Sequence, residues 1–133
     1  MEKFSIELSV RDYELDVQGI VNNSVYQNYL EHARHEFLHH HGIDFVDFAQ
    51  NNIMLVVKSI EMNFKNSLVS RDKFKIEVSA EKEGNLKVVF NQDIIRLEDN
   101  KPILSAKVTG VAIKNGRPVA PDTIPQIESL IMN

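Results

Sequence analysis

One acidic side chain, Asp16, stands in a polar loop just ahead of a long helical pattern and is the first candidate for chemistry in this chain. It lies about seven residues before the expected helix start, where the positive end of the helix dipole favours an ionised carboxylate. Gly19 allows a ligand or a second backbone segment to approach closely, and the apolar neighbours Leu15, Val17, Ile20 and Val21 would partly exclude water. Such a carboxylate can act as a general base or as a nucleophile toward an acyl carbonyl. The alternative is that Asp16 only caps its own turn, as loop aspartates commonly do.

Five histidines lie in the helical pattern or directly after it, and His32, His35 and His39 share one helical face. Three imidazoles on one face suggest a metal site, because histidine is a common ligand of zinc and other transition metals. The face carries no nearby acidic ligand, however, and cationic imidazoles close to a helix C-terminus are favourable without any metal. We therefore predict that this cluster holds no metal.

Composition limits the possible classes of protein. The chain has 133 residues, of which 43% are apolar and 26% charged, as expected of a single soluble domain covering residues 1–133. A net charge of −4 argues against a nucleic-acid binder, which needs a basic face to neutralise phosphates. The absence of cysteine excludes disulfides, cysteine-ligated metal sites and a thiol nucleophile. No apolar run is long enough to span a bilayer and the N-terminus lacks a signal-peptide pattern, so we expect a cytoplasmic protein without membrane insertion.

The hydrophobic periodicity predicts a strand, a long helix and then four more strands. The helix begins at one of three good N-caps, Asn22, Asn23 or Ser24, and ends at Gly42, which gives about 18 residues and a length of roughly 27 Å. Shorter patterns predict a second helix at 44–50 and a closing helix at 123–131. Alternating or continuous apolar residues predict strands at residues 4–10, 53–64, 73–81, 86–97 and 103–113.

Short turns join the last four strands, which favours an antiparallel sheet. One helix cannot cover both faces of a five-stranded sheet, yet several residues expected on the outward face are apolar. This double-sided apolarity favours an oligomer. The outward residues in question are Val89, Ile95, Leu97, Val108 and Ala112.

The segment from residue 16 to residue 34 resembles the signature of the 4-hydroxybenzoyl-CoA thioesterase group of hotdog-fold proteins, which includes the acyl-CoA thioesterases of the Tol-Pal-associated type. The shared pattern runs from Asp-x-x-Gly-x-Val through a polar pair and a tyrosine to Glu and Ala-Arg. The likeness continues through 36–42 and returns at 55–58, 64–72 and 74–76, so it covers most of the chain. The matching residues of the main motif are Asp16, Gly19, Val21, Asn22, Asn23, Tyr26, Tyr29, Leu30, Glu31, Ala33 and Arg34.

The resemblance implies an α+β hotdog fold, in which a bent antiparallel sheet of about five strands wraps around one long helix. Two subunits are expected to pair into one continuous sheet as a homodimer, which can associate further into a tetramer. The expected activity is that of a hydrolase acting on an acyl-CoA thioester, or on an acyl group carried by an acyl-carrier protein. No cofactor is expected, because coenzyme A is part of the substrate. A non-enzymatic hotdog protein that binds acyl thioesters is the alternative.

In proteins of this kind the aspartate that matches Asp16 attacks the thioester carbonyl or activates the water that does. The resemblance also implies that backbone N–H groups at the start of the central strand hold the oxyanion, and such donors are worth ~3 kcal/mol or more. Many relatives carry His or Tyr where this chain has Asn23, and asparagine orients a carbonyl or a water but cannot exchange a proton near neutral pH. The acyl class therefore stays open. The expected substrate-binding residues are Gly19, Asn23, Tyr26, Met54, Leu55 and Val56.

The remaining helix residues are expected to have structural roles. Tyr26 and Tyr29 lie on the apolar stripe, which predicts core or dimer-interface positions, and Tyr26 is also placed to wall the acyl pocket. Glu31 and Arg34 are three residues apart and would form an exposed ion pair worth ~0.3 kcal/mol. Basic residues that could meet the phosphates of coenzyme A are scattered along the chain, so none is singled out. They are Lys58, Lys65, Lys82, Lys87, Lys114 and Arg117.

Overall fold

The computed structural model describes residues 3–131. The predicted helices and strands are all present, and the structure adds two short 3-10 turns and a short sixth strand to them. The elements are β1 (Phe4–Ser9), η1 (Asp12–Glu14), α1 (Asn23–His40), α2 (Phe45–Gln50), β2 (Ile53–Phe64), β3 (Lys73–Glu83), β4 (Lys87–Arg96), β5 (Pro102–Lys114), β6 (Arg117–Val119), η2 (Pro121–Thr123) and α3 (Pro125–Ile131).

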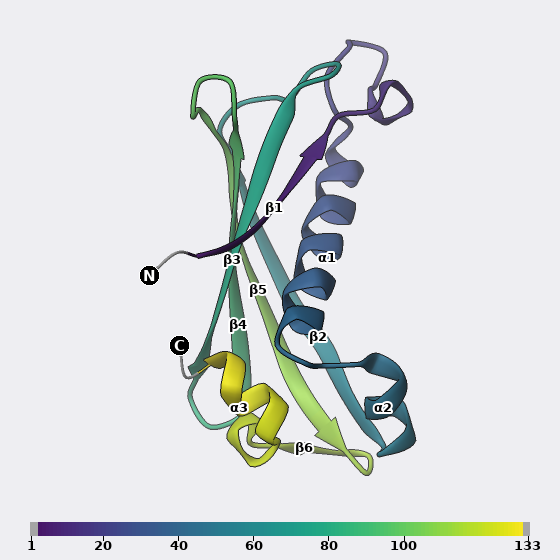
Figure 1. The fold of residues 1–133 in the computed structure, drawn as a ribbon, viewed down its shortest axis with the longest axis vertical. Helices are drawn as coiled ribbons and strands as arrows, with labels where there is room; N and C mark the ends of the chain where they lie inside the picture. Colours follow the sequence, from purple (N-terminus) through teal and green to yellow (C-terminus); the bar gives the residue numbers. More distant parts are fainter. Residues whose placement is uncertain (1–2, 132–133) are drawn as a thin grey trace.

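All strands belong to one curved antiparallel sheet that bends around α1 (Figure 1). The strand order is β1-β3-β4-β5-β2, and β6 pairs with the end of β5. Because sequence-neighbouring strands β3, β4 and β5 are joined by short turns, their antiparallel pairing follows directly from the connections. The expected fold, a bent sheet around one long helix, is therefore confirmed.

Helix α1 forms because its apolar residues recur every three or four positions, which places them on one face against the sheet. Of the three candidate N-caps, Asn22 takes the role, since its side chain accepts a hydrogen bond from the backbone N–H of Ser24 (3.4 Å). Gly42 has a φ of +81°, the left-handed conformation that commonly follows a helix end. The buried side chains of the helix are Tyr26, Tyr29, Leu30, Ala33, Arg34, Phe37 and Leu38.

The prediction of which apolar residues face outward from the sheet is only partly correct. Val108 and Ala112 belong to the buried core, on the side of the sheet that faces the helices. Both alternating faces of β5 carry apolar residues, so the sequence does not determine which set points inward, and a shift by one residue exchanges the faces. Val89 lies outside the core cluster but is fully buried, and Ile95 and Leu97 are half-buried.

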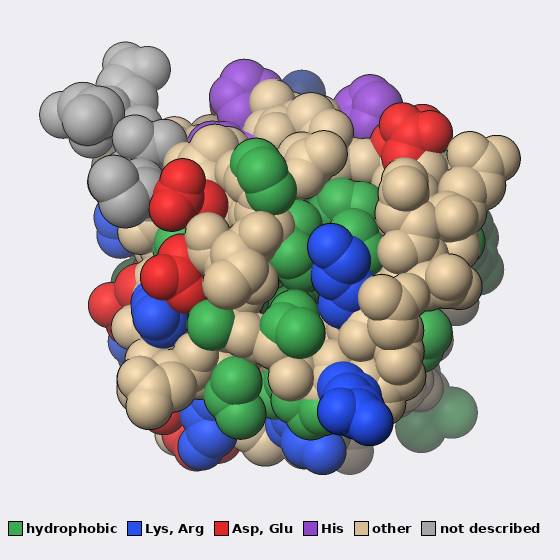
Figure 2. All heavy atoms as spheres, turned by 90° about the horizontal axis from the view of Figure 1, so that it is seen from below, with side chains coloured by type: hydrophobic (Ala, Val, Ile, Leu, Met, Phe, Trp, Pro, Cys, Tyr) green, Lys and Arg blue, Asp and Glu red, His purple; other side chains and the backbone are tan. Residues whose placement is uncertain are grey.

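Strand β2 is one edge of the sheet, and α1 leaves much of its surface uncovered. Four of its apolar side chains stay exposed: Met54 (57%), Val57 (46%), Ile60 (37%) and Phe64 (48%). Figure 2 views the molecule from below, at the end where α2, β6 and α3 lie, and shows further hydrophobic side chains gathered among Lys and Arg. Open strand edges flanked by apolar side chains are typical sites of association between chains.

Within residues 3–131, no helix has the length and apolar character needed to cross a membrane.

Candidate active site

Asp16 lies in a tight turn that Gly19 closes. The Gly19 N–H donates to the Asp16 carbonyl (3.0 Å), and the Asp16 N–H donates to the Ile20 carbonyl (2.8 Å). The carboxylate oxygen Oδ1 accepts hydrogen bonds from the backbone N–H groups of Gln18 (2.8 Å) and Ile20 (3.4 Å). Gly19 has a φ of +82°, a conformation that glycine adopts without strain. Asp16 therefore caps its own turn through Oδ1, while its Oδ2 accepts no hydrogen bond from the part of the chain that the structure describes.

The two ends of this turn are fixed to the rest of the protein. Leu15 pairs with Val21 across the turn, and the Val21 N–H donates to the Leu68 carbonyl (3.0 Å). Ile20 pairs with Val69 in a second isolated bridge. These contacts hold the half-buried Asp16 in one place relative to the start of α1.

A buried carboxylate, Glu14, ties the same loop to the helix. Its Oε1 accepts a hydrogen bond from the Tyr29 hydroxyl at 2.6 Å and another from the Arg11 N–H at 2.8 Å. The Arg11 guanidinium forms an ion pair with the other carboxylate oxygen at 3.2 Å. Burial raises the pKa of Tyr29, and the hydrogen bond to Glu14 raises it further. The Glu14–Tyr29 contact therefore anchors the backbone two residues before Asp16 to the middle of α1.

A cavity of about 180 Å³ lies where this loop meets the start of α1. Tyr26 forms its inner wall, where the hydroxyl oxygen accepts a hydrogen bond from the Leu68 N–H (3.0 Å) and the ring packs edge-on against Phe64 (5.5 Å). Burial raises the pKa of Tyr26, the bond from Leu68 lowers it, and the charges of Asp72 and Asp16 raise it. Asp16 does not itself line the cavity, but its charge acts on the cavity wall. The lining residues are Val21, Asn23, Tyr26, Phe64, Lys65, Asn66 and Ser67.

The first turn of α1 offers backbone donors at this cavity. Asn22 caps the helix and its carbonyl accepts from the Val25 N–H (2.9 Å), as expected at a helix start. Asn23 is exposed and lines the cavity, and its backbone N–H has no acceptor among residues 3–131. A free N–H group at a helix N-terminus is suited to bind a negatively charged oxygen.

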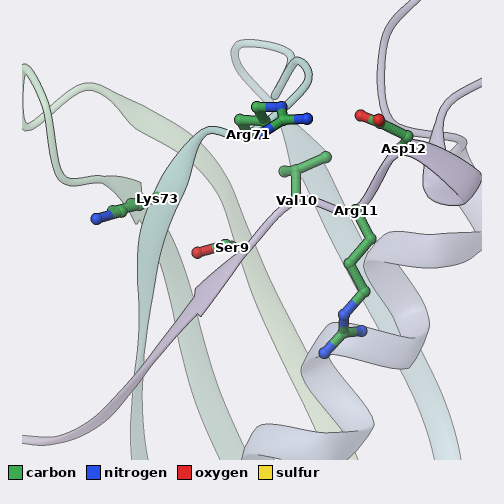
Figure 3. A pocket seen from close by; sticks show the side chains of 6 residues that line it. All are labelled: Ser9, Val10, Arg11, Asp12, Arg71 and Lys73. Atoms are coloured by element: carbon green, nitrogen blue, oxygen red, sulfur yellow. The ribbon is translucent and has the colours of Figure 1, made fainter.

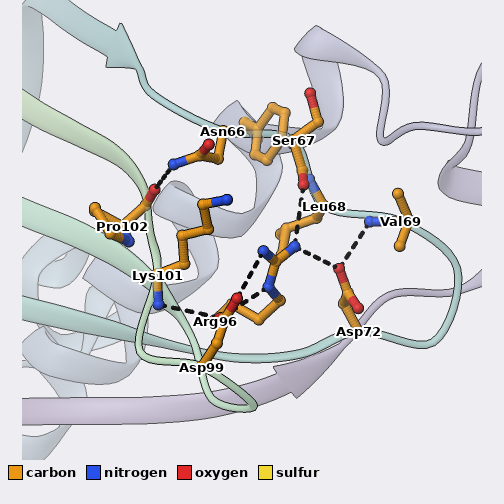
Figure 4. A network of polar contacts seen from close by, with 10 residues as sticks. Asn66, Ser67, Leu68, Val69, Asp72, Arg96, Asp99, Lys101 and Pro102 are labelled. Carbon is orange, nitrogen blue, oxygen red and sulfur yellow. Dashed lines mark hydrogen bonds and ion pairs between the residues drawn. The ribbon is translucent and has the colours of Figure 1, made fainter.

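The loop that forms the far wall, residues 65–72, is held by Arg96 (Figure 4). The guanidinium contacts Asp99 through two nitrogens (3.0 and 3.1 Å) and Asp72 through a third (3.4 Å), and it reaches the Ser67 carbonyl at 3.5 Å. Asn66 donates to the Pro102 carbonyl (2.7 Å). The cavity wall is thus fastened to the β4–β5 turn.

The six predicted substrate-binding residues fall into two groups. Gly19 belongs to the Asp16 turn, and Asn23 and Tyr26 line the adjoining cavity. The predicted oxyanion-hole residues lie at the opposite end of β2 from Phe64, roughly 30 Å away along the strand, so one chain does not bring them to Asp16. Exposed Met54 lines a hollow of about 300 Å³, whereas Leu55 and Val56 line a smaller pocket beside α1.

Arg34 does not form the exposed ion pair with Glu31 that the spacing suggested. Its side chain is buried beside Leu55 and Val56, and its Nη1 donates to the buried Gln92 Oε1 (3.1 Å). The helix turns Arg34 toward the sheet and leaves Glu31 in solvent. No carboxylate of the described residues lies within ion-pair distance of Arg34.

Basic side chains gather around another hollow, of about 520 Å³, at the end of β1. Figure 3 shows that Arg11, Arg71 and Lys73 leave the backbone there in different directions. They do not converge on one point, so this surface does not single out a phosphate-binding group. In the described part of the chain, no group of three or more His, Cys, Asp or Glu side chains is placed to hold a metal ion.

Several residues that build the site were not identified from the sequence: Glu14, Phe64, Leu68 and Arg96. The sequence did contain one signal, because a buried tyrosine such as Tyr29 needs a partner for its hydroxyl. A partner 15 residues away in the chain becomes visible only in the folded structure.

The comparison with protein families matches residues 10–127 to the thioesterase-like superfamily. The chain is 40% identical over 119 residues to the chloroplastic acyl-acyl carrier protein thioesterase ATL3 of Arabidopsis thaliana, covering 89% of this chain and 63% of the relative. It is 29% identical over 107 residues to the long-chain acyl-CoA thioesterase FadM of Escherichia coli K12, covering 80% of each. The chain thus spans less than two thirds of the length of ATL3.

A solved structure with the same architecture is that of the probable thioesterase YbaW from Escherichia coli. It is 26% identical to this chain, with a TM-score of 0.83, and the superposition covers 96% of this chain and 98% of that one. The agreement in fold extends over nearly the whole of both chains. With its bent sheet, its central helix and a family match over residues 10–127, this chain belongs to the thioesterase-like superfamily.

Proposed function

We propose that this protein is an acyl thioesterase that hydrolyses an acyl-CoA or an acyl-carrier-protein thioester, with Asp16 as the nucleophile or the general base. The observation that carries the proposal is the placement of Asp16. Its Oδ1 is held by two backbone N–H groups while its Oδ2 accepts no hydrogen bond from residues 3–131, and the same loop leads into Val21 and Asn23, which line the cavity at the start of α1. A carboxylate fixed in this way keeps one oxygen available as a base or nucleophile, and membership of the thioesterase-like superfamily indicates thioester hydrolysis as the reaction class.

The proposed reaction needs no group beyond the protein, water and the thioester. In the general-base route, Asp16 takes a proton from water as the water oxygen bonds to the carbonyl carbon. The carbon–sulfur bond then breaks, and the leaving thiolate takes the proton. In the nucleophilic route, Oδ2 bonds to the carbonyl carbon, the thiolate leaves, and water then opens the resulting anhydride. Coenzyme A, where it occurs, is part of the substrate.

Two sets of backbone donors could stabilise the oxyanion in this proposal. The set implied by the family resemblance lies near Met54 and Leu55, and it reaches Asp16 only if a second copy supplies it. The other is the backbone N–H of Asn23 at the cavity itself, for which residues 3–131 offer no acceptor. Donors of this kind act without a titratable side chain, so the presence of asparagine at position 23 does not weaken the proposal.

The test of the activity is a panel of acyl-CoA and acyl-carrier-protein thioesters, with the released thiol detected by a chromogenic reagent. We expect turnover on at least one acyl class, and we expect Asp16→Asn to lower kcat by orders of magnitude. The amide oxygen that this substitution introduces can still accept the Gln18 N–H, so the turn should survive. Asp47→Asn is the matched control, because Asp47 is exposed on α2 and its side chain makes no hydrogen bond or ion pair within residues 3–131. Near-normal turnover in Asp16→Asn would overturn the mechanism, and binding of thioesters without turnover would favour the non-enzymatic alternative.

We also propose that the active form is a homodimer joined along β2. An antiparallel pairing of two β2 edges would place the Met54 end of one strand beside the Phe64 end of the other. Because Phe64 lines the cavity at Asn23 and Tyr26, the two separated groups of predicted residues would then meet. The pairing would also cover the exposed apolar side chains of β2.

Light scattering after size-exclusion chromatography tests the dimer, which should have twice the 15.2 kDa mass of one chain. Ile60→Lys places a charge on the exposed apolar strip and should shift the protein to a monomer with little activity. Ser5→Lys on β1, the opposite edge, is the matched control and should remain a dimer. A wild-type monomer with full activity would contradict the shared site.

The names of the relatives indicate two carriers for the acyl group. The Arabidopsis protein is named for acyl-acyl carrier protein and the Escherichia coli protein for long-chain acyl-CoA. We propose no narrower substrate group, and membership of the 4-hydroxybenzoyl-CoA or Tol-Pal-associated group stays a prediction. Cytoplasmic location also stays a prediction, because the Arabidopsis relative is named as chloroplastic.

A further inference from the structure

The side chain of Arg34 is a buried cation that has no ion-pair partner among residues 3–131. Arg34 is 7% exposed. Its side chain makes one hydrogen bond to the described residues, which it donates to the neutral amide oxygen of Gln92. The amide nitrogen of Gln92 in turn donates to the Leu30 carbonyl (2.9 Å). Burial lowers the pKa of Arg34, and only the charge of Glu31, which is exposed, raises it. A guanidinium that has lost most of its water and gained no carboxylate is costly, because buried charges are normally paired.

The unpaired nitrogens of Arg34 face open space. Nε and Nη2 make no hydrogen bond to residues 3–131. Every fully buried side-chain nitrogen or oxygen within residues 3–131 has a hydrogen-bond partner, so these two nitrogens are not fully buried. These two nitrogens therefore keep contact with a space outside the packed core. That space is a pocket of about 140 Å³ that Arg34 lines, between α1, α2 and the sheet.

The other walls of this pocket are mainly apolar. Leu38, Phe45 and Phe90 contribute side chains from the two helices and from β4, and the Leu55–Val57 stretch of β2 forms another wall. The backbone of Gly110 also lines the pocket. A Cβ added at Gly110 would lie 3.3 Å from the Val56 carbonyl oxygen. Glu31 and His35, both exposed, lie among the lining residues as well.

Such a pocket suits one class of ligand. An apolar volume near 150 Å³ holds a molecule of the size of benzene. The guanidinium adds paired N–H donors, which match a carboxylate in a bidentate arrangement. We propose that this pocket binds a small organic acid, with its carboxylate on Arg34 Nε and Nη2 and its apolar body against Leu38, Phe90 and Val56.

The site is separate from the cavity at Asp16. Arg34 lies three turns along α1 from Asn23, roughly 16 Å at 1.5 Å per residue. Binding of an acid there does not require thioesterase activity, although in the proposed dimer the Leu55–Val56 wall of one copy would approach the Asp16 cavity of the other. If that activity is present, the acids it releases are one natural source of the ligand.

Isothermal titration calorimetry with benzoate tests the proposal, with benzamide as the uncharged ligand of similar shape. We expect benzoate to bind at millimolar concentration or better, benzamide to bind at least about tenfold more weakly, and Arg34→Gln to lose a similar factor for benzoate. Arg117→Gln removes an exposed arginine of β6 that makes no hydrogen bond or ion pair through its side chain within the described residues, and it should bind benzoate like the wild type. Asp16→Asn should also bind normally, which separates this site from failure of the catalytic proposal.

A second measurement needs no variant and protects the test if Arg34→Gln does not fold. Benzoate should shift the side-chain Nε–H resonance of Arg34 in ¹⁵N-labelled protein, and benzamide should not. Equal binding of benzoate and benzamide, or no shift at Arg34, would overturn the proposal. A further contrary result is loss of the dimer in Arg34→Gln without benzoate binding, which would mean that a carboxylate of the second copy pairs with Arg34.

Discussion

Replacing Tyr29 with Phe removes one oxygen from the contact that anchors the Asp16 loop to α1. The Tyr29 hydroxyl lies 2.6 Å from Glu14 Oε1, and the two residues are 4% and 7% exposed. Hydrogen bonds to charged groups contribute about 1.5–3 kcal/mol, and the two Arg11 donors would still serve the Glu14 carboxylate. We therefore expect Tyr29→Phe to lower the free energy of unfolding by about 2 kcal/mol.

The assay is urea unfolding followed by far-ultraviolet circular dichroism, since the chain has no tryptophan to report fluorescence. A loss of this size corresponds to a fall in Tm of roughly 5–10 °C for a domain of this length. Tyr13→Phe is the matched control, because Tyr13 is 81% exposed, and its change should stay within about 0.5 kcal/mol. An equally small change in Tyr29→Phe would refute the role given to the Glu14–Tyr29 contact.

The same contact predicts a dependence on alkaline pH. Burial and the bond to Glu14 raise the pKa of Tyr29 above its unfolded value of about 10. A raised pKa means that the neutral hydroxyl stabilises the fold fully below that pH and loses this contribution as the pH rises toward the folded pKa. The difference in unfolding free energy between wild type and Tyr29→Phe should therefore be constant from pH 7 to about 9 and shrink by about pH 11. A difference that grows in that range would mean that the sign of the coupling is wrong.

Two further substitutions test other parts of the structure. Arg96→Gln should lower the Tm at pH 7, because the guanidinium joins Asp99 and Asp72 to the cavity loop. The hydrogen bond from Arg96 lowers the pKa of Asp99, so the Asp99 part of this effect should fade as the pH falls below about 4. Thermal unfolding of both proteins at pH 7 and pH 3 measures the difference. Gly110→Ala should lower the free energy of unfolding, measured in urea, by about 1 kcal/mol. The added Cβ would lie only 3.3 Å from the Val56 carbonyl oxygen, so β2 must move to admit it. An unchanged urea midpoint would show that the strand moves without cost.

The sequence was sufficient for the order of the elements because each has a strong local signal. The stripe from Tyr26 to Leu38 has helical spacing, and the alternation from Phe74 to Ala80 has strand spacing. Local signals were insufficient where both faces of an element are apolar, as in β5, where Val108 and Ala112 proved to be core residues. Which alternate residues of β5 face the core depends on its pairing with β2 and β4, and the local sequence pattern does not indicate that pairing.

The Asp16 turn and the cavity residues Asn23 and Tyr26 were expected from a short stretch of sequence, because residues 16–26 are close together both in the chain and in space. Arg34 was misjudged for the opposite reason. Its spacing from Glu31 suggested an exposed pair, but Arg34 is buried against the sheet while Glu31 stays exposed, and Gln92, 58 residues away, accepts the hydrogen bond of the guanidinium. Partners that are distant in sequence decided each of these differences.

The polar contacts around the Asp16 loop have a common consequence for function. Glu14 is bound to Tyr29, Val21 to Leu68, and Asp72 of the opposite wall to Arg96, so buried or half-buried hydrogen bonds anchor the loop and the wall that faces it. Holding a loop in one conformation is costly in conformational entropy, and these hydrogen bonds offset part of that cost. Val17 at the tip of the turn is fully exposed, and the Oδ2 atom of Asp16 accepts no hydrogen bond from residues 3–131. A carboxylate whose backbone is fixed and whose second oxygen has no partner among residues 3–131 is arranged as a reacting group would be, because fixed geometry lowers the entropy lost in reaching a transition state.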